Sequence, residues 1–148
     1  MLGTNSGHGD FSCALWLRLD ALPGRIQQVV HHAGKPELQI TADGHAEVFF
    51  DRFCGHIASR TALQPERWYF LAVVRADGRA VLYLDGEREG AAAARDCDCS
   101  SAAPLVLGGD GDFGEPFSGA LDDVTFWSRA LSETEVVEWF RSGSVDLP

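Results

Sequence analysis

Basic residues are scarce in this chain. Its 148 residues include 12 lysines and arginines against 22 aspartates and glutamates, so the formal net charge is −10. Nucleic-acid affinity comes mostly from basic side chains that displace counterions from phosphates, and we therefore expect no nucleic-acid partner. The same Coulomb argument disfavours acidic membranes and strongly anionic polysaccharides, whereas it favours calcium.

The sequence also lacks any hydrophobic run long enough to cross a bilayer. Its first ten residues are polar and glycine-rich, without the basic and apolar regions of a secretory signal. We therefore expect either a cytosolic protein or a piece of a longer exported one. Four cysteines (Cys13, Cys54, Cys97 and Cys99) are too few to predict a disulfide scaffold, and a bridge, a soft-metal site and free thiols all stay open for the last three.

Hydrophobic residues are abundant and follow a period of two. They make up 45% of the chain, enough for a single domain over residues 1–148. One face of residues 11–19 carries Phe11, Cys13, Leu15, Leu17 and Leu19, and the other carries Ser12, Ala14, Trp16 and Arg18. We expect strands at 11–19, 26–31, 37–41, 46–50, 54–59, 68–75, 80–85, 105–107 and 120–127, a strand edge and loop over 87–103, and a loop over 61–67.

Local turn and cap signals support this division. Asp77-Gly78 joins two strongly apolar runs and predicts a tight hairpin turn with positive φ. Ser132 and Glu135 have the spacing of a capping box, which satisfies backbone N–H groups at the start of a helix. Leu131 and Val136 are placed to form the accompanying hydrophobic staple. The sequence therefore predicts a short C-terminal helix over 133–141.

Five motifs, taken together, resemble those of laminin-G-like, concanavalin A-like lectin/glucanase domains. They are D-F-S at 10–12 with Trp16, W-Y-F-L-A at 68–72, L-Y-L-D-G at 82–86, L-G-G at 107–109 with F-S-G-A-L-D-D-V at 117–124, and S-R-A-L-S at 128–132. The resemblance spans residues 10–140. It implies an all-β fold, an antiparallel jelly-roll sandwich of two sheets with a short C-terminal helix, in which Trp16, Trp68 and Trp127 are mostly core residues.

Similar domains usually carry another strand before the D-F-S motif, but only a short segment precedes Phe11 here. Residues 1–9 are therefore expected to be a flexible or edge segment. If they leave a sheet edge unpaired, that edge invites pairing with another chain. A homodimer through the open edge is the resulting prediction.

An acidic, glycine-rich loop is the strongest candidate for a binding site. Residues 108–115 place three carboxylates among glycines, which suits calcium but is also typical of a solvated turn. The resemblance implies calcium near Asp122, and Asp112 is the second candidate ligand. We expect no other cofactor. The expected ligand contacts are Asp110, Asp112, Phe113 and Glu115, with Asp51, Arg52 and His56 as a second set.

The resemblance implies a binding module. The first hypothesis is a non-catalytic, lectin-like carbohydrate-binding module, extracellular or at the cell surface, that binds a glycan or glycoprotein. The alternative is a protein-interaction or adhesion module of the same fold. A glycan-active enzyme is a distant third, because the Asp-x-Asp-x-x-Glu at 110–115 lies in a loop, where glycines do not hold two carboxylates at the ~5 Å separation that retaining glycosidases need.

Overall fold

The computed structural model describes residues 10–31, 37–50, 55–94, 105–109 and 116–143. Within these ranges the chain forms two five-stranded antiparallel sheets and one helix. The elements are β1 (Phe11–Leu19), β2 (Gln27–His31), β3 (Glu37–Ile40), β4 (His45–Phe49), β5 (His56–Ala62), β6 (Trp68–Ala76), β7 (Arg79–Leu84), β8 (Glu87–Ala93), β9 (Val106–Leu107), β10 (Gly119–Trp127) and α2 (Glu133–Gly143).

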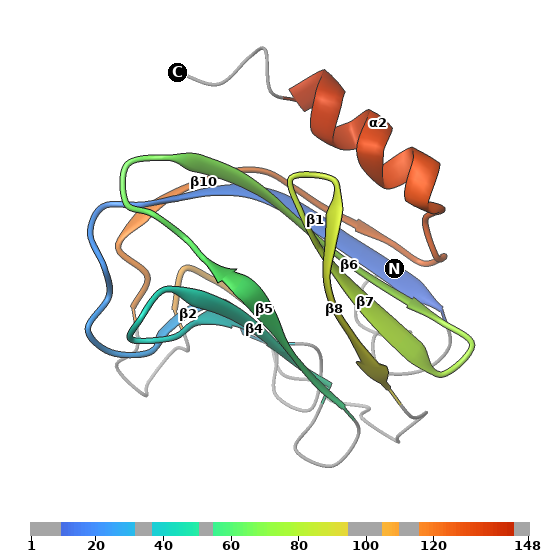
Figure 1. Cartoon of the computed structure of the whole chain (residues 1–148), viewed down its shortest axis with the longest axis horizontal. Coiled ribbons are helices and arrows are strands. Elements are labelled where there is room, and N and C mark those ends of the chain that lie inside the picture. Colours follow the sequence, from blue (N-terminus) through green and yellow to red (C-terminus); the bar gives the residue numbers. More distant parts are fainter. Residues whose placement is uncertain (1–9, 32–36, 51–54, 95–104, 110–115, 144–148) are drawn as a thin grey trace.

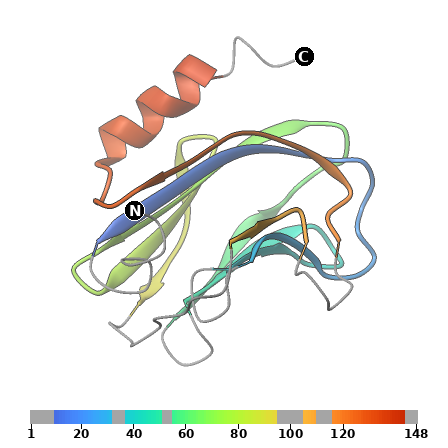
Figure 2. The same cartoon turned by 180° about the vertical axis from the view of Figure 1, so that it is seen from behind.

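One sheet, here the β1 sheet, has the strand order β10-β1-β6-β7-β8, and the other, the β3 sheet, has the order β5-β4-β3-β2-β9. Figures 1 and 2 show the two sheets as stacked layers, with α2 over the side of the β1 sheet that faces away from the β3 sheet. The predicted all-β sandwich with a C-terminal helix is confirmed. Within the described part of the chain, no helix has the length and apolarity needed to span a membrane.

Two Asp-Gly turns fold β6, β7 and β8 into a meander. Asp77 and Gly78 have φ values of 51° and 74°, and Asp85 and Gly86 have values of 51° and 82°. Positive φ at both central residues gives a turn whose twist matches that of the flanking strands. The predicted hairpin at Asp77-Gly78 is confirmed, and the second Asp-Gly forms the turn of another hairpin, between β7 and β8.

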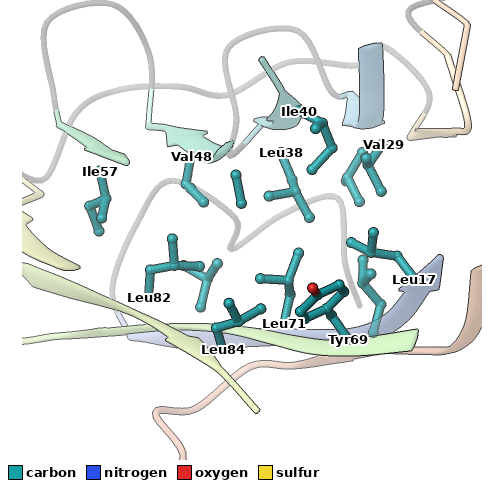
Figure 3. Close-up of a cluster of buried hydrophobic side chains, with 14 of the residues drawn as sticks. Leu17, Val29, Leu38, Ile40, Val48, Ile57, Tyr69, Leu71, Leu82 and Leu84 are labelled. Carbon is teal, nitrogen blue, oxygen red and sulfur yellow. The ribbon is translucent and has the colours of Figure 1, made fainter. Parts of the chain in front are cut away.

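The main core lies between the sheets. Figure 3 shows Leu38, Val48 and Ile57 of the β3 sheet pointing toward Leu71 and Leu82 of the β1 sheet. All five side chains are almost completely buried. Because strand side chains alternate, the residues between these positions lie on the outer faces of the sheets.

A second apolar cluster attaches the helix to the outer face of the β1 sheet. Trp16 is 5.3 Å from Phe70 and 5.7 Å from Phe140 of α2, measured between ring centroids. The buried Leu131 and Val136 join the same cluster, as the predicted staple requires. Trp68 and Trp127 are partly buried beside them, so these tryptophans pack under or beside the helix and not between the sheets.

The capping box is formed as predicted. The backbone N–H of Glu135 donates to Ser132 Oγ over 3.1 Å, and the N–H of Ser132 donates to Glu135 Oε1 over 3.1 Å. The helix runs on to Gly143, two residues past the expected end.

One predicted boundary is wrong by more than a residue or two. Strand β5 continues to Ala62, where the sequence predicted a loop from Thr61. The backbone N–H and the hydroxyl of Thr61 both donate to the carboxylate of Glu89 on β8, over 2.8 and 3.0 Å. This long-range link holds the end of β5 extended and joins the edges of the two sheets.

Candidate functional site

Most of the predicted site residues lie outside the described part of the chain. The described residues do not include Asp51, Arg52, Asp110, Asp112, Phe113 and Glu115. His56 and Asp122 are described, and they lie in different sheets, at the start of β5 and in the middle of β10.

Asp122 lies opposite Trp16 on the edge strand β10 and is exposed. Its Oδ1 accepts a hydrogen bond of 2.8 Å from the backbone N–H of Asp123. Asp123 has a φ of 48°, at the point where the register of β10 against β1 shifts. Among the residues that the structure describes, no group of three or more His, Cys, Asp or Glu side chains could hold a metal ion. Because Asp112 lies outside those residues, calcium at Asp122 and Asp112 stays a prediction.

His56 points to a different part of the molecule, the outer face of the β3 sheet. Ile57 faces the core, so its neighbour His56 faces away from it, and the side chain is 48% exposed. Leu38 and Val48 also face the core. Their neighbours Gln39 and Glu47 therefore share the outer face with His56.

A row of polar side chains, joined by two hydrogen bonds and one carboxylate–imidazole contact, crosses four strands on this face. Gln28 Nε2 donates to Gln39 Oε1 over 2.9 Å, and Gln39 Nε2 donates to Glu47 Oε2 over 2.7 Å. Glu47 Oε1 lies 3.5 Å from His56 Nε2. Gln28 pairs with Gln39 and Gln39 pairs with Glu47 across the ladders, which places the side chains side by side. We call Gln28, Gln39, Glu47 and His56 the polar row.

An aromatic stack borders the polar row. The His56 imidazole lies on the Phe49 ring with 4.4 Å between centroids and 21° between planes. Phe49 pairs with Glu37 across the β3–β4 ladder, and Glu37 Oε1 lies 3.4 Å from His31 Nδ1. The face therefore combines carboxylates, amides and imidazoles with a flat ring. Such a mixture can hydrogen-bond a polar ligand and contact its apolar surface.

No sequence motif predicted Gln28, Gln39 and Glu47 as site residues. Their signal is present, since Gln39 lies between two apolar residues of β3 and Glu47 between two of β4. Alternation identifies an outward-facing residue. It does not show that residues 8 or 11 positions apart are neighbours across a ladder.

Cys13 has no sign of a reactive thiol. It lies on β1 among core residues, and desolvation by burial raises the pKa of its thiol to about 12. The thiolate is the nucleophilic form, so the raised pKa lowers the reactivity of this thiol at neutral pH. The other three cysteines lie outside the described residues.

The chain belongs to the Concanavalin A-like lectin/glucanases superfamily, because a laminin-G-type family model of that description matches residues 3–137. The recognised family is thus confirmed over most of the chain. A search of curated proteins finds no match.

Solved structures show the same fold at low sequence identity. A proposed carbohydrate-binding protein of Bacteroides ovatus has a TM-score of 0.75 and 19% identity, over 88% of this chain and 40% of that one. The receptor-binding domain of botulinum neurotoxin D has a TM-score of 0.74 and 16% identity, over 96% and 39%. A sialidase of Trypanosoma rangeli has a TM-score of 0.69 and 15% identity, over 92% and 23%. This chain spans less than half the length of each.

Proposed function

We propose that this chain is a non-catalytic carbohydrate-binding module. The observation that carries the proposal is the outer face of the β3 sheet, where the polar row and the Phe49–His56 stack lie together. Carbohydrates present many hydroxyl groups and a weakly polar ring face, so they need both kinds of contact. Two of the structural neighbours are a proposed carbohydrate-binding protein and a receptor-binding domain, which is consistent with this function.

The placement of the helix supports the same choice of face. Helix α2 covers the outer side of the β1 sheet and buries its aromatic residues there. Within the described ranges no helix covers the outer side of the β3 sheet. A glycan or glycoprotein, met outside the cell or at its surface, is the proposed partner.

Binding is proposed in preference to catalysis. Retaining glycosidases need a nucleophile and an acid/base carboxyl ~5–5.5 Å apart in a fixed frame. The acidic loop sequence at 110–115 intersperses its carboxylates with glycines, which does not provide such a frame. The sialidase neighbour shares the fold, and a fold by itself does not carry an activity.

A glycan array, probed with and without calcium, tests the proposal. Binding to at least one saccharide class is expected, and a signal that calcium strengthens and Asp112→Ala removes would place calcium in the site. An array without any signal, together with measurable hydrolysis of the same glycans, would contradict a non-catalytic binding module.

A protein-interaction module is the second candidate function. Among the described residues β10 pairs with β1 on one side only, and Trp139 beside it is 41% exposed while packing edge-on against Trp127 at 5.2 Å. Such an edge and an exposed aromatic side chain suit a protein partner or a second copy. Pull-down of a stable protein partner with a silent array would favour this function. Light scattering tests the homodimer, which a monomer mass would contradict.

A further inference from the structure

We propose that the polar row forms a subsite for a neutral sugar ring, with Glu47 as its central contact and with no requirement for calcium. The proposal rests on the carbohydrate-binding function proposed above and specifies where and how that function is carried out. It assigns the ligand to the β3 sheet and not to the acidic loop at 108–115.

The hydrogen bonds of the row have a fixed direction. A carboxylate only accepts, so Gln39 must donate to Glu47 through its amide NH₂ group and therefore presents its carbonyl to Gln28. Gln28 and Gln39 are 5% and 7% exposed, which leaves them little freedom to turn away. The two glutamines thus hold the Glu47 carboxylate in place before any ligand arrives, which reduces the entropy lost on binding.

Glu47 keeps acceptor capacity for a ligand. Its Oε2 takes the 2.7 Å bond from Gln39, while among the described residues its Oε1 has the 3.5 Å contact with His56. Each carboxylate oxygen has two lone-pair positions, so hydroxyl donors can still be accepted. The side chain is 20% exposed, so solvent and a ligand reach it.

The described neighbours of Glu47 on β5 are a small side chain and a flat ring. Ala58 is its ladder partner on β5 and is exposed, so among the described residues a methyl group lies on that side of the carboxylate. Two residues before Ala58 on the same strand, the half-exposed His56 lies on Phe49 and presents a flat edge. A sugar ring placed over Ala58 would give hydroxyls to Glu47 and contact this stack.

The charges on the face select a neutral ligand. Its described titratable groups are Glu37 beside His31, Glu47 beside His56, His45 with Asp43 3.9 Å away, and Arg60 at the border with β8. The Arg60 guanidinium donates to the backbone carbonyl of Arg88, away from the row. With the whole chain at −10, a uronic or sialic acid would meet repulsion here. The contacts come directly from side chains, so no bridging cation is needed.

The test uses the full chain in buffer with EDTA and four neutral probes, the hexasaccharides of cellulose, xylan, β-1,3-glucan and chitin. Backbone amide shifts in an isotope-labelled sample locate the site, and calorimetry gives the affinity. We expect at least one probe to shift amides of β3, β4 and β5. Glu47→Gln should lower the affinity for that probe by roughly tenfold or more, since it removes a charged hydrogen-bond acceptor.

Three variants make the result specific. Glu133→Gln is the matched control, because Glu133 is 59% exposed on α2 at the far side of the β1 sheet, and it should bind like the parent chain. Gln39→Met keeps the side-chain length but removes the donor, and it should weaken binding if it positions Glu47. Ala58→Leu places a larger side chain beside Glu47 at an exposed site and should block binding. It tests the subsite independently of Glu47→Gln, so the proposal stays testable if that variant misfolds.

The outcomes separate the subsite from the function. Binding that Glu47→Gln and Ala58→Leu leave unchanged would overturn the subsite, while the carbohydrate-binding function would stand. Binding that appears only with calcium would have the same meaning. If the hexasaccharides and the whole glycan array are silent, both proposals fail together.

Discussion

Ser12→Ala should destabilise the fold by detaching the segment that leads into the helix. Ser12 is completely buried on β1, where its Oγ donates to the carbonyl of Arg129 over 2.9 Å and accepts from the N–H of Leu131 over 2.8 Å. This single hydroxyl therefore fixes the chain between β10 and α2 against the β1 sheet.

The size of the effect follows from which group is left without a partner. Arg129 is exposed, so water can satisfy its carbonyl, whereas Leu131 is 4% exposed and its N–H would stay buried and unpaired. A buried donor without an acceptor costs ~1–3 kcal/mol, so about 2 kcal/mol is expected here. For a domain of this size, that corresponds to a fall in Tm of about 4–8 °C.

Urea unfolding followed by circular dichroism measures this loss, with Ser142→Ala as the matched control. Ser142 is exposed on α2 and donates to the Trp139 carbonyl over 3.2 Å, so its removal should change stability by less than ~0.5 kcal/mol. Equal stabilities for the two variants would refute the idea that Ser12 anchors the helix segment. An unchanged midpoint with a lower slope would point instead to a change in the unfolded chain.

Three further predictions concern charge, packing and reactivity. The hydrogen bonds from Arg129 hold the pKa of Glu135 at about 2, well below its ordinary value of 4.5. The pair therefore stabilises the helix start fully at a pH above about 4.5, and this stabilisation is lost as the pH falls toward 2. Tm measured against pH should therefore fall less steeply below about pH 4.5 for Glu135→Gln than for the parent, and parallel curves would contradict this. A Cβ on Gly90 would lie 2.7 Å from Ile57 Cγ2, so Gly90→Ala should lower the free energy of unfolding by about 1–3 kcal/mol and with it the urea midpoint. An unchanged midpoint would show that the two edges can separate without cost. The raised pKa of the Cys13 thiol predicts slow reaction with iodoacetamide at pH 8 in the folded chain and faster reaction once urea unfolds it, as peptide mass spectrometry can show. Equally rapid labelling of the folded and unfolded chain would refute the desolvation of this thiol.

Local signals in the sequence predicted the elements well. The capping box at Ser132 involves neighbours three residues apart, and the Asp77-Gly78 turn needs only its own two residues. Strand β1 runs from Phe11 to Leu19 as the alternation indicated. Each of these features depends on chemistry within one stretch of chain, so the sequence alone suffices.

The candidate face could not be predicted in the same way. Gln28, Gln39 and Glu47 become neighbours through the register of two hairpins, and a register shift between Gln28 and Val30 on β2 changes which residues are opposite. A shift of one residue would turn each side chain to the other face. Sequence motifs directed attention to the acidic loop, because carboxylates close together in sequence are visible there without a structure.

The tryptophans show a similar limit. Their aromatic character predicted burial, and Trp16 is buried. It packs under α2 with Phe140, because β1 has apolar residues on both faces and the helix covers the second one. Alternation alone does not distinguish a core between sheets from one between a sheet and a helix.

The most direct test of the account is a crystal structure of the chain soaked with the saccharide that gives the strongest array signal. We expect sugar density on the outer side of the β3 sheet, with a hydroxyl within hydrogen-bond distance of Glu47 and the ring beside His56. Density confined to the helix-covered side, or bound through calcium at Asp122, would contradict it.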